Sequence, residues 1–254
     1  MKMFLRRVWN RLADLRNKRV LYTIWFNFRN FPFDKARHLP VLFYNGAYAT
    51  ILQGGRLELT EQFWANNGRV LVGYPSLDFE YQCEKTHLNI VGGVLRLNGS
   101  LDVRRGCIVE IKGVCTFGED VVFGPRCRVR VHNELLIGST VRVAHETQIF
   151  DSNFHYVENV NEPGFNPISK PIRIGSYVWI CNRSTVQAGS VLPSRTILAS
   201  NSLLNRDFAD LEPDSLIGGT PARFIKRGVS RVWDRKREFE YHKREFEWYR
   251  RMYE

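Results

Sequence analysis

Apolar residues recur at every sixth position through the second half of this 254-residue chain. The positions are Ile174, Ile180, Val186, Leu192, Leu198 and Leu204. This spacing matches neither the 3.6-residue period of an α-helix nor the two-residue alternation of a single strand. It predicts instead a coil of very short strands that turns every six residues. Each of these apolar residues would then point into one narrow core.

The same six-residue period extends backward in three sets that begin 20 residues apart. The sets are Leu97, Val103 and Val109; Phe117, Phe123 and Val129; and Ile137, Val143 and Ile149. Because three six-residue faces need only 18 residues, each of these turns should carry about two extra residues at one corner. Small or β-branched residues, which would fit at the corners, follow the apolar positions by four places: Cys107, Val121, Cys127, Val141, Thr147, Val178, Ser184, Ser190, Thr196 and Ser202. We therefore predict an all-β solenoid of triangular coils, interrupted by a loop at 154–173.

Segments of a different character flank the solenoid. Residues 1–38 are basic and look helical, and short β-like runs in 39–96 are expected to form irregular first coils that cap the open end. These runs are 41–44, 56–59, 69–72 and 88–91. The sequence thus divides into a helical segment at 1–38, a solenoid domain at 39–229 and a C-terminal segment at 230–254.

The C-terminal segment carries an apolar stripe. Val232, Phe239, Phe246 and Tyr253 are seven residues apart, with charged residues between them. This pattern predicts one amphipathic helix over 230–253. We expect its apolar face to dock against the solenoid or a neighbouring subunit.

The charge balance narrows the choice of partners only a little. A net charge of +11 favours an anionic partner, but charge alone does not distinguish nucleic acid, a phosphorylated small molecule and a membrane surface. No apolar run approaches the length of a membrane span. The first ten residues are basic and partly apolar but lack the features of a signal peptide. They would suit either a packed helix or an amphipathic helix lying on a membrane surface.

Cysteine usage favours a reduced, cytoplasmic protein. The five cysteines are odd in number and include no Cys-x-x-Cys pair. They lie at positions 83, 107, 115, 127 and 181. We expect Cys107 and Cys127 to be stacked core residues, since they occupy the same site in adjacent coils.

Three motifs resemble a known family. The run Pro-Ile-Arg-Ile-Gly-Ser-Tyr-Val-Trp-Ile at 171–180 and the run Leu-Ile-Gly-Gly-Thr-Pro-Ala-Arg-Phe-Ile-Lys-Arg at 216–227 resemble the hallmarks of hexapeptide-repeat O-acetyltransferases. Within that family the chain looks closest to the galactoside/maltose acetyltransferase type. The aromatic pattern at 22–33, followed by Leu39-Pro40, is similar to members found with capsule, exopolysaccharide and lipopolysaccharide synthesis.

The resemblance carries several expectations. It implies a left-handed parallel β-helix, a homotrimer with active sites between subunits, and acetyl-CoA as the acyl donor in the groove between neighbouring prisms. It also implies a saccharide or a sugar-linked molecule as acceptor, and no metal. Peripheral association with a membrane stays open.

The implied reaction needs a base and an oxyanion site. A sugar hydroxyl is a poor nucleophile at neutral pH, and histidine is suited to taking its proton. His155, in Asp-Ser-Asn-Phe-His, matches the family's catalytic histidine. Its second ring nitrogen needs an acceptor, for which Asp151, Glu158, Glu162 or a backbone carbonyl is available. The resemblance also places an oxyanion-binding backbone amide at Cys181–Asn182, and we include Asn182 among the catalytic residues.

Further positions match the family's binding residues. Acetyl-CoA is expected to contact a set of residues in the last coils and the segment that follows them: Trp179, Ala199, Ser200, Asn205, Arg206, Pro221, Arg223 and Lys226. Cations in this set would meet its phosphates. The acceptor is expected to contact Asn153, Arg126 and Arg128, and the two arginines would suit an anionic sugar.

Other functions use the same type of scaffold. An acetyltransferase that inactivates an antibiotic would share the fold and the histidine. A zinc enzyme of the γ-carbonic anhydrase type would need three histidine ligands. His132, His145 and His155 could supply them, but they lack that family's paired spacing. A nucleophilic role for Cys181 is a further alternative, and nucleic-acid binding rests on net charge alone.

Overall fold

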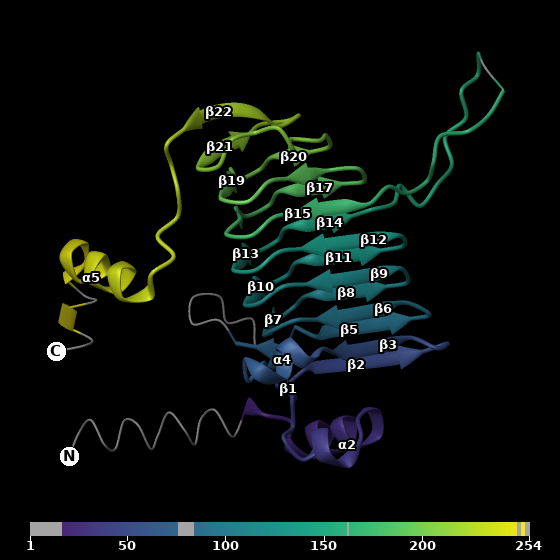
Figure 1. Ribbon diagram of the computed structural model, residues 1–254, viewed down its shortest axis with the longest axis vertical. Helices are drawn as coiled ribbons and strands as arrows, with labels where there is room; N and C mark the ends of the chain where they lie inside the picture. The colour runs from purple at the N-terminus through teal and green to yellow at the C-terminus, as the bar shows by residue number, and fades with distance from the viewer. Residues whose placement is uncertain (1–16, 76–83, 162, 248–249, 252–254) are drawn as a thin grey trace.

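The chain folds into a triangular prism built from three parallel β-sheets (Figure 1). The structure is a computed structural model and describes residues 17–75, 84–161, 163–247 and 250–251. The chain runs from the first sheet to the second, then to the third, and returns to the first one coil further along the axis. This path confirms the predicted all-β solenoid of hexapeptide coils and makes it a parallel β-helix.

Each sheet collects one strand from successive coils. The first sheet contains β1 (Val41–Phe43), β4 (Val70–Tyr74), β7 (Leu101–Arg104), β10 (Val121–Phe123), β13 (Val141–Val143), β16 (Trp179–Ile180), β19 (Thr196–Leu198), β21 (Ser215–Gly218) and β22 (Arg223–Arg227). The second sheet contains β2 (Ala47–Leu52), β5 (Thr86–Val91), β8 (Ile108–Ile111), β11 (Arg128–Val131), β14 (Gln148–Phe150), β17 (Thr185–Gln187) and β20 (Leu203–Leu204). The third sheet contains β3 (Arg56–Leu59), β6 (Val94–Leu97), β9 (Val114–Phe117), β12 (Glu134–Ile137), β15 (Ile172–Ile174) and β18 (Val191–Leu192). The pairings among these strands are parallel except that of β21 with β22, which closes the upper end of the first sheet.

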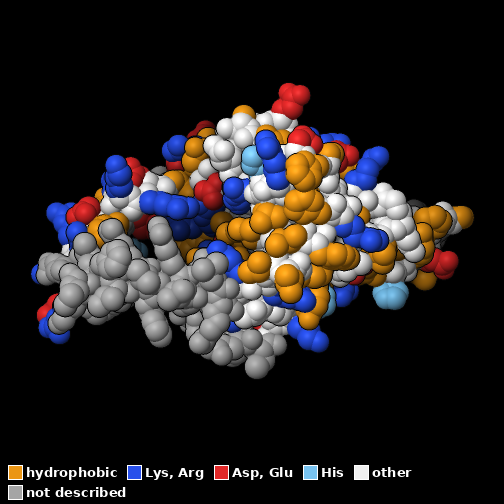
Figure 2. Space-filling model, turned by 90° about the horizontal axis from the view of Figure 1, so that it is seen from below, with side chains coloured by type: hydrophobic (Ala, Val, Ile, Leu, Met, Phe, Trp, Pro, Cys, Tyr) orange, Lys and Arg blue, Asp and Glu red, His pale blue; other side chains and the backbone are white. Residues whose placement is uncertain are grey.

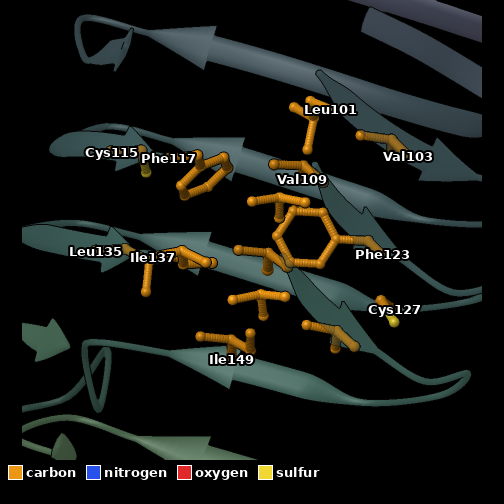
Figure 3. Packing of buried hydrophobic residues seen from close by; sticks show 14 of the residues in the cluster. Leu101, Val103, Val109, Cys115, Phe117, Phe123, Cys127, Leu135, Ile137 and Ile149 are labelled. Carbon is orange, nitrogen blue, oxygen red and sulfur yellow. The ribbon is translucent and has the colours of Figure 1, made fainter. Parts of the chain in front are cut away.

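The core of the prism is the predicted ladder of apolar residues. All members of the six-residue period are buried, and so are the small residues expected at the corners. Figure 3 shows side chains from the three sheets meeting on the prism axis. The rings of Phe117 and Phe123 pack edge to face in the core, with centroids 5.8 Å apart. The period of the sequence therefore translates directly into the packing.

The corner cysteines behave as small core residues. The thiol of Cys107 donates to the carbonyl of Gly124 at 3.0 Å, and that of Cys127 donates to the carbonyl of Ala144 at 3.1 Å. Cys115 and Cys181 are also buried and free, whereas Cys83 lies outside the described residues. The stacking predicted for Cys107 and Cys127 is thus confirmed.

A helix covers the lower end of the prism, where the first coil would otherwise expose the edges of β1 and β2. This helix is α2 (Val20–Asn30), followed by α3 (Phe33–Ala36), while α4 (Glu61–Ala65) lies within the first coil. On α2, the side chain of Asn27 donates to the carbonyl of Val41 at 2.7 Å and accepts from the amide of Val41 at 3.1 Å. Thr23 Oγ1 accepts from the amide of Phe43 at 3.1 Å. Side chains of α2 therefore replace the missing neighbouring strand.

This cap gives a prediction about stability. Asn27 is completely buried, so Asn27→Ala leaves the amide and the carbonyl of Val41 without partners. We expect the free energy of unfolding to fall by about 2–4 kcal/mol, measured by chemical denaturation. Asn30→Ala is the matched control, because it removes one local bond to the carbonyl of Phe26 on the same helix. An equal loss in the two variants would contradict the capping role of Asn27.

The predicted interruption at 154–173 is an arm that projects from the corner between the second and third sheets (Figure 1, upper right). Its two sides run antiparallel. The amide of Asn153 donates to the carbonyl of Ile168 at 2.8 Å, and the amide of Asn166 donates to the carbonyl of Val157 at 3.0 Å. The arm therefore has an ordered path that leaves the prism after β14 and returns before β15.

The C-terminal helix is shorter than predicted. Helix α5 spans Arg235–Glu245 and begins at Asp234, whose side chain accepts from the amides of Lys236 and Arg237. Phe246 adopts an extended conformation and ends the helix. The prediction of one helix over 230–253 is therefore wrong. No residue of α5 is buried, and Figure 1 shows the helix standing away from the sheets, so its docking on another subunit stays a prediction.

Candidate active site

The corner between the first and second sheets forms a regular column that we call the first edge. Its turns superimpose coil by coil, because Phe123 pairs with Val143 and Val143 pairs with Ile180. The third residue of each turn is left-handed, with φ between 55° and 61°: Arg126, Glu146, Arg183 and Asn201. The residue before it accepts a hydrogen bond from the next coil, as when Asn182 O accepts from the amide of Asn201 at 3.0 Å. The first edge is thus a rigid line of repeated backbone groups.

The amide of Asn182 is an available hydrogen-bond donor on this edge. The amide of Cys181 donates to the carbonyl of Leu198 at 2.9 Å and is used by the coil. Within the described part of the chain, the amide of Asn182 donates to no acceptor. Its side-chain oxygen accepts from the hydroxyl of Ser200 at 2.7 Å. Of the two amides at the predicted oxyanion position, Asn182 therefore offers the available N–H.

Cys181 does not have the properties of a nucleophile. Its side chain is buried, and this burial raises the pKa of the thiol to about 11, against smaller opposing effects of Ser200 and Arg231. The thiol is therefore protonated at neutral pH, whereas nucleophilic catalysis needs the thiolate. The geometry disfavours the alternative in which Cys181 attacks the substrate.

The two arginines predicted to contact the acceptor are engaged within the prism. Arg126 bridges Glu84 at 2.6 Å and Glu146 at 3.1 Å, and Arg183 binds the other oxygen of Glu146 at 2.7 Å. Arg128 donates to the carbonyl of Gly106 at 2.6 Å. These contacts tie successive coils together along the first edge. A contact of either arginine with an acceptor stays a prediction.

His155 lies at the root of the arm, on the corner between the second and third sheets, which we call the second edge. Its side chain is exposed. The preceding residue, Phe154, has a left-handed φ of 62° and donates its amide to Ser152 Oγ at 3.1 Å. A non-glycine residue adopts this conformation only when its surroundings hold it there. The turn at 152–154 therefore fixes the direction in which His155 leaves the prism.

Phe154 is held by three side chains of the second edge. Its ring packs edge to face against His132 at 5.1 Å and against Phe150 at 5.9 Å. The guanidinium of Arg130 lies 5.8 Å from the ring centroid. These contacts could not be predicted from the sequence, because neither the positive φ of Phe154 nor its contact with His132 one coil away follows from a local pattern. The contacts of Phe154 hold the backbone turn that precedes His155.

Asp151 is a structural carboxylate in this chain. It is completely buried, and its two oxygens accept from the amides of His132 at 2.8 Å and Asn133 at 2.7 Å. The structure thus joins Asp151 to the turn of the coil below and not to His155. Glu158 lies further out on the arm and is exposed, while Glu162 is outside the described residues. Asn153 is exposed beside the root of the arm.

The predicted coenzyme A residues divide between the two edges and the top of the prism. Ala199 and Ser200 continue the first edge above Asn182, and Pro221 follows the last turn of that edge. Asn205 and Arg206 follow β20 on the second edge and are exposed. Two further cations, Arg223 and Lys226, lie exposed on β22.

Trp179 points outward from the first sheet toward the C-terminal segment. Arg231 lies 5.6 Å from its ring centroid, and both residues line an open cavity of about 580 Å³ together with α5. Sequence reasoning did not identify Arg231, which lies beyond the motif at 216–227. The outer face of the Trp179 ring therefore borders an open cavity, as a residue that lines a binding pocket must.

The two edges are separated by the width of the second sheet but lie at similar heights. His155 follows β14, Asn182 precedes β17, and these strands are hydrogen-bonded neighbours. Adjacent strands are about 4.8 Å apart, so the two corners differ in height by about one coil. One chain thus presents a candidate base at one edge of the second sheet and a candidate oxyanion donor at the other edge.

The histidines of the zinc alternative do not lie on one edge. His132 packs against Phe154 on the second edge, whereas His145 lies in the turn of the first edge. In the described ranges, no group of three His, Cys, Asp or Glu side chains is arranged to hold a metal ion. Over the same ranges, no helix is long and apolar enough to cross a membrane.

Comparisons with known proteins find acetyltransferases. No protein-family model matches the chain. The chain is 22% identical over 134 residues to an Escherichia coli (strain K12) protein named as a lipopolysaccharide biosynthesis O-acetyl transferase, a match that covers 49% of this chain and 67% of that protein. Among solved structures, it is similar to the polysialic-acid-specific acetyltransferase NeuO, with 15% identity, coverage of 82% of this chain and 89% of that chain, and a TM-score of 0.46. It is also similar to a hexapeptide-repeat acetyltransferase of Vibrio cholerae O1 biovar eltor complexed with acetyl-CoA, with 25% identity, coverage of 48% and 64%, and a TM-score of 0.40.

Proposed function

We propose that this chain is an acetyl-CoA-dependent O-acetyltransferase that modifies a saccharide hydroxyl in bacterial surface polysaccharide biosynthesis. The observation that carries the proposal is the placement of two groups at similar heights on the prism. These are the exposed His155 on the second edge and the available amide of Asn182 on the first edge. A base and an oxyanion donor are the pair that acyl transfer to an alcohol needs. The sequence similarity to a protein named as a lipopolysaccharide O-acetyl transferase supports the reaction and the substrate class.

The complete site is shared by two copies of the chain. In a closed cyclic trimer whose axis runs along the prism, neighbouring copies stand at the same height. With the second sheet turned toward that axis, the second edge of one copy meets the first edge of the next. His155 of one copy then faces Asn182 of its neighbour across the groove. The similar heights of the two corners support this arrangement.

The reaction follows from the two groups. A ring nitrogen of His155 takes the proton of the acceptor hydroxyl as the hydroxyl oxygen attacks the thioester carbon. The carbonyl oxygen becomes negatively charged and accepts a hydrogen bond from the amide of Asn182. When the tetrahedral intermediate collapses, the carbon–sulfur bond breaks and the imidazolium returns its proton to the leaving thiolate. The products are the acetyl ester and free coenzyme A.

Acetyl-CoA would lie along the groove between the two edges. The amide of Ser200 continues the line of Asn182, and the amide groups of the donor's arm can pair with it and with the carbonyl of Ala199, whose own N–H is used by the coil. Arg223 and Lys226 are exposed on β22 at the top of the prism. Among the described residues, neither forms an ion pair, so both can meet phosphate groups. Asn205 and Arg206 would contribute from the second edge of the neighbouring copy.

The acceptor would enter beside the arm. Asn153 is exposed two residues before His155 and can hydrogen-bond a sugar hydroxyl. The use of acetyl-CoA and the free, buried cysteines support a cytoplasmic location.

A coenzyme A release assay tests the proposed function. The purified protein is incubated with acetyl-CoA and a panel of neutral and acidic saccharides, and free thiol is measured with time. We expect release to depend on one class of saccharide and the acetyl ester to appear in equal amount. Release that no saccharide stimulates, or stoichiometric zinc in an active preparation, would contradict the proposal.

Phe154→Ala should lower kcat without changing KM for acetyl-CoA. The substitution removes the ring contacts that hold the turn before His155, so the imidazole samples unproductive directions. A displacement of about 1 Å can cost up to about a hundredfold, and we expect kcat to fall at least about tenfold. Phe154→Tyr keeps the ring and should restore most of the activity. Equal kcat in Phe154→Ala and the unsubstituted protein would contradict the positioning role.

A further inference from the structure

Helix α2 exposes an apolar surface on the side that faces away from the prism. Val20, Leu21, Ile24, Trp25 and Phe28 follow a spacing that places them on one side of the helix, opposite the buried Thr23, Phe26 and Asn27. Phe33 of α3 joins them, because its ring packs against Phe28 with centroids 5.9 Å apart. We call these six apolar residues the α2 face.

The exposure of the α2 face is large for apolar residues. Leu21 is 83% exposed, Phe33 is 72% exposed and Trp25 is 52% exposed. Figure 2 views the prism from this end and shows hydrophobic side chains gathered there, with lysine and arginine side chains at the margin. Contiguous apolar surface on a soluble protein marks an interaction site. The α2 face makes none of the capping contacts with β1, because those contacts come from Thr23 and Asn27 on the opposite side of the helix.

The charges beside the α2 face indicate what covers it. Arg29, Lys35 and Arg37 are exposed around it, and Asp34 is the one acidic residue between positions 17 and 38. The guanidinium of Arg29 lies 5.6 Å from the ring centroid of Trp25. Two copies joined through this face would bring these like charges together. An anionic surface would pair with them and also accept the apolar side chains.

We propose that the α2 face docks the prism end-on to an anionic lipid bilayer. The apolar side chains would enter the boundary between headgroups and acyl chains, Trp25 would lie at the interface, and the cations would reach the lipid phosphates. Helix α2 packs along the end of the prism through Thr23 and Asn27, so it would lie in the plane of the membrane. The interaction surface differs from the predicted amphipathic helix of the first ten residues, which lie outside the described part of the chain.

This orientation has a consequence for the candidate active site. The second sheet places four strand spacings between β2 and β14, or about 19 Å, so the root of the arm would stand well above the membrane surface. In the trimer of the proposed function, three α2 faces would point to the same side. Simultaneous binding of the three would strengthen the attachment.

Cosedimentation with lipid vesicles tests the docking surface without acetyl-CoA or an acceptor, so its result is independent of the proposed function. The full-length protein is mixed with vesicles of equal parts phosphatidylglycerol and phosphatidylcholine, and with vesicles of phosphatidylcholine alone. We expect stronger binding to the anionic vesicles and a loss of that preference at high salt. Leu21→Gln/Phe33→Gln should bind at least about tenfold more weakly. Both side chains are highly exposed, so the fold should be unaffected.

Two matched variants separate this surface from general effects. Val160→Gln changes an apolar residue of the arm that is 93% exposed and should leave vesicle binding unchanged. Arg29→Gln/Lys35→Gln should weaken binding to anionic vesicles, whereas Arg56→Gln/Arg173→Gln, on the third sheet, should have less effect. Absence of vesicle binding, or equal binding by Leu21→Gln/Phe33→Gln, would overturn the proposal. A change of native mass in that variant with unchanged vesicle binding would also overturn it, because it would identify the α2 face as a subunit contact.

Discussion

His155→Ala should lower kcat for saccharide-dependent coenzyme A release by about 10²–10⁴-fold, the range that a positioned general base contributes. The imidazole is the proposed acceptor of the hydroxyl proton and the donor to the leaving thiolate. The side chain is exposed and packs into no core, so the variant should fold as the unsubstituted protein does. KM for acetyl-CoA should change little, because the proposed coenzyme A contacts lie on other residues. The measurement is steady-state kinetics at saturating acetyl-CoA.

His38→Ala provides the control for this variant. His38 is also exposed but lies at the lower end of the prism, next to α3. Its removal should leave kcat within about twofold of the unsubstituted value, as expected for a surface residue away from the reaction. If His155→Ala kept more than half of the activity, the proposed base would be wrong.

Asn182→Pro should lower kcat by about 10²–10³-fold, because proline has no N–H to stabilise the oxyanion. The turn accepts a proline at this place. Pro125 occupies the equivalent position two coils below, as the pairing of β10 with β13 and of β13 with β16 shows. The substitution therefore removes one hydrogen-bond donor from a turn whose path is already compatible with proline. Thermal denaturation should confirm that the coil is retained.

Asn182→Ala separates the backbone from the side chain. It keeps the amide and removes the oxygen that accepts from Ser200. We expect its kcat to stay within a few-fold of the unsubstituted value, since one exposed hydrogen bond contributes little. If Asn182→Ala lost as much activity as Asn182→Pro, the side chain and not the amide would be the catalytic group.

The core of the prism could be predicted from the sequence because its cause is local. Each coil repeats the same short spacing, and residues such as Ile180 and Leu198 are buried wherever that spacing recurs. The corner residues Cys107 and Cys127 follow from the same register. The capping contacts of Asn27 and Thr23 with β1 could not be predicted, because they join residues that no period relates.

The surroundings of the candidate site were harder to predict because stacking of the coils decides them. Asp151 precedes His155 by four residues, yet its carboxylate binds the turn at 132–133 in the coil below. One contact between coils, the ion pair of Arg126 with Glu146, could have been predicted from the sequence. Arg126 and Glu146 are 20 residues apart, the length of one coil in this region, which places them at the same corner in adjacent turns. Applying the coil length to charged residues, as well as apolar ones, would have predicted that ion pair.

The C-terminal helix shows a different limit. The seven-residue spacing of Val232, Phe239 and Phe246 favours one helix across all three, but α5 spans only Arg235–Glu245 and Phe246 is extended. Asp234 is a favourable N-cap and sets the start. No residue of α5 is buried, so the helix has no packed partner. Apolar spacing alone does not carry α5 past Glu245.

The central claim is that one active site joins the second edge of one copy to the first edge of the next, and mixed oligomers test it most directly. His155→Ala and Asn182→Pro chains are each expected to be nearly inactive. Coexpressed and purified together through different tags, they should regain about one third of the unsubstituted activity. Every selected trimer contains both chains, and in either composition one of its three interfaces joins a second edge with His155 to a first edge with the Asn182 amide. Recovery to that level is the predicted result, and mixed oligomers no more active than either parent would contradict the account.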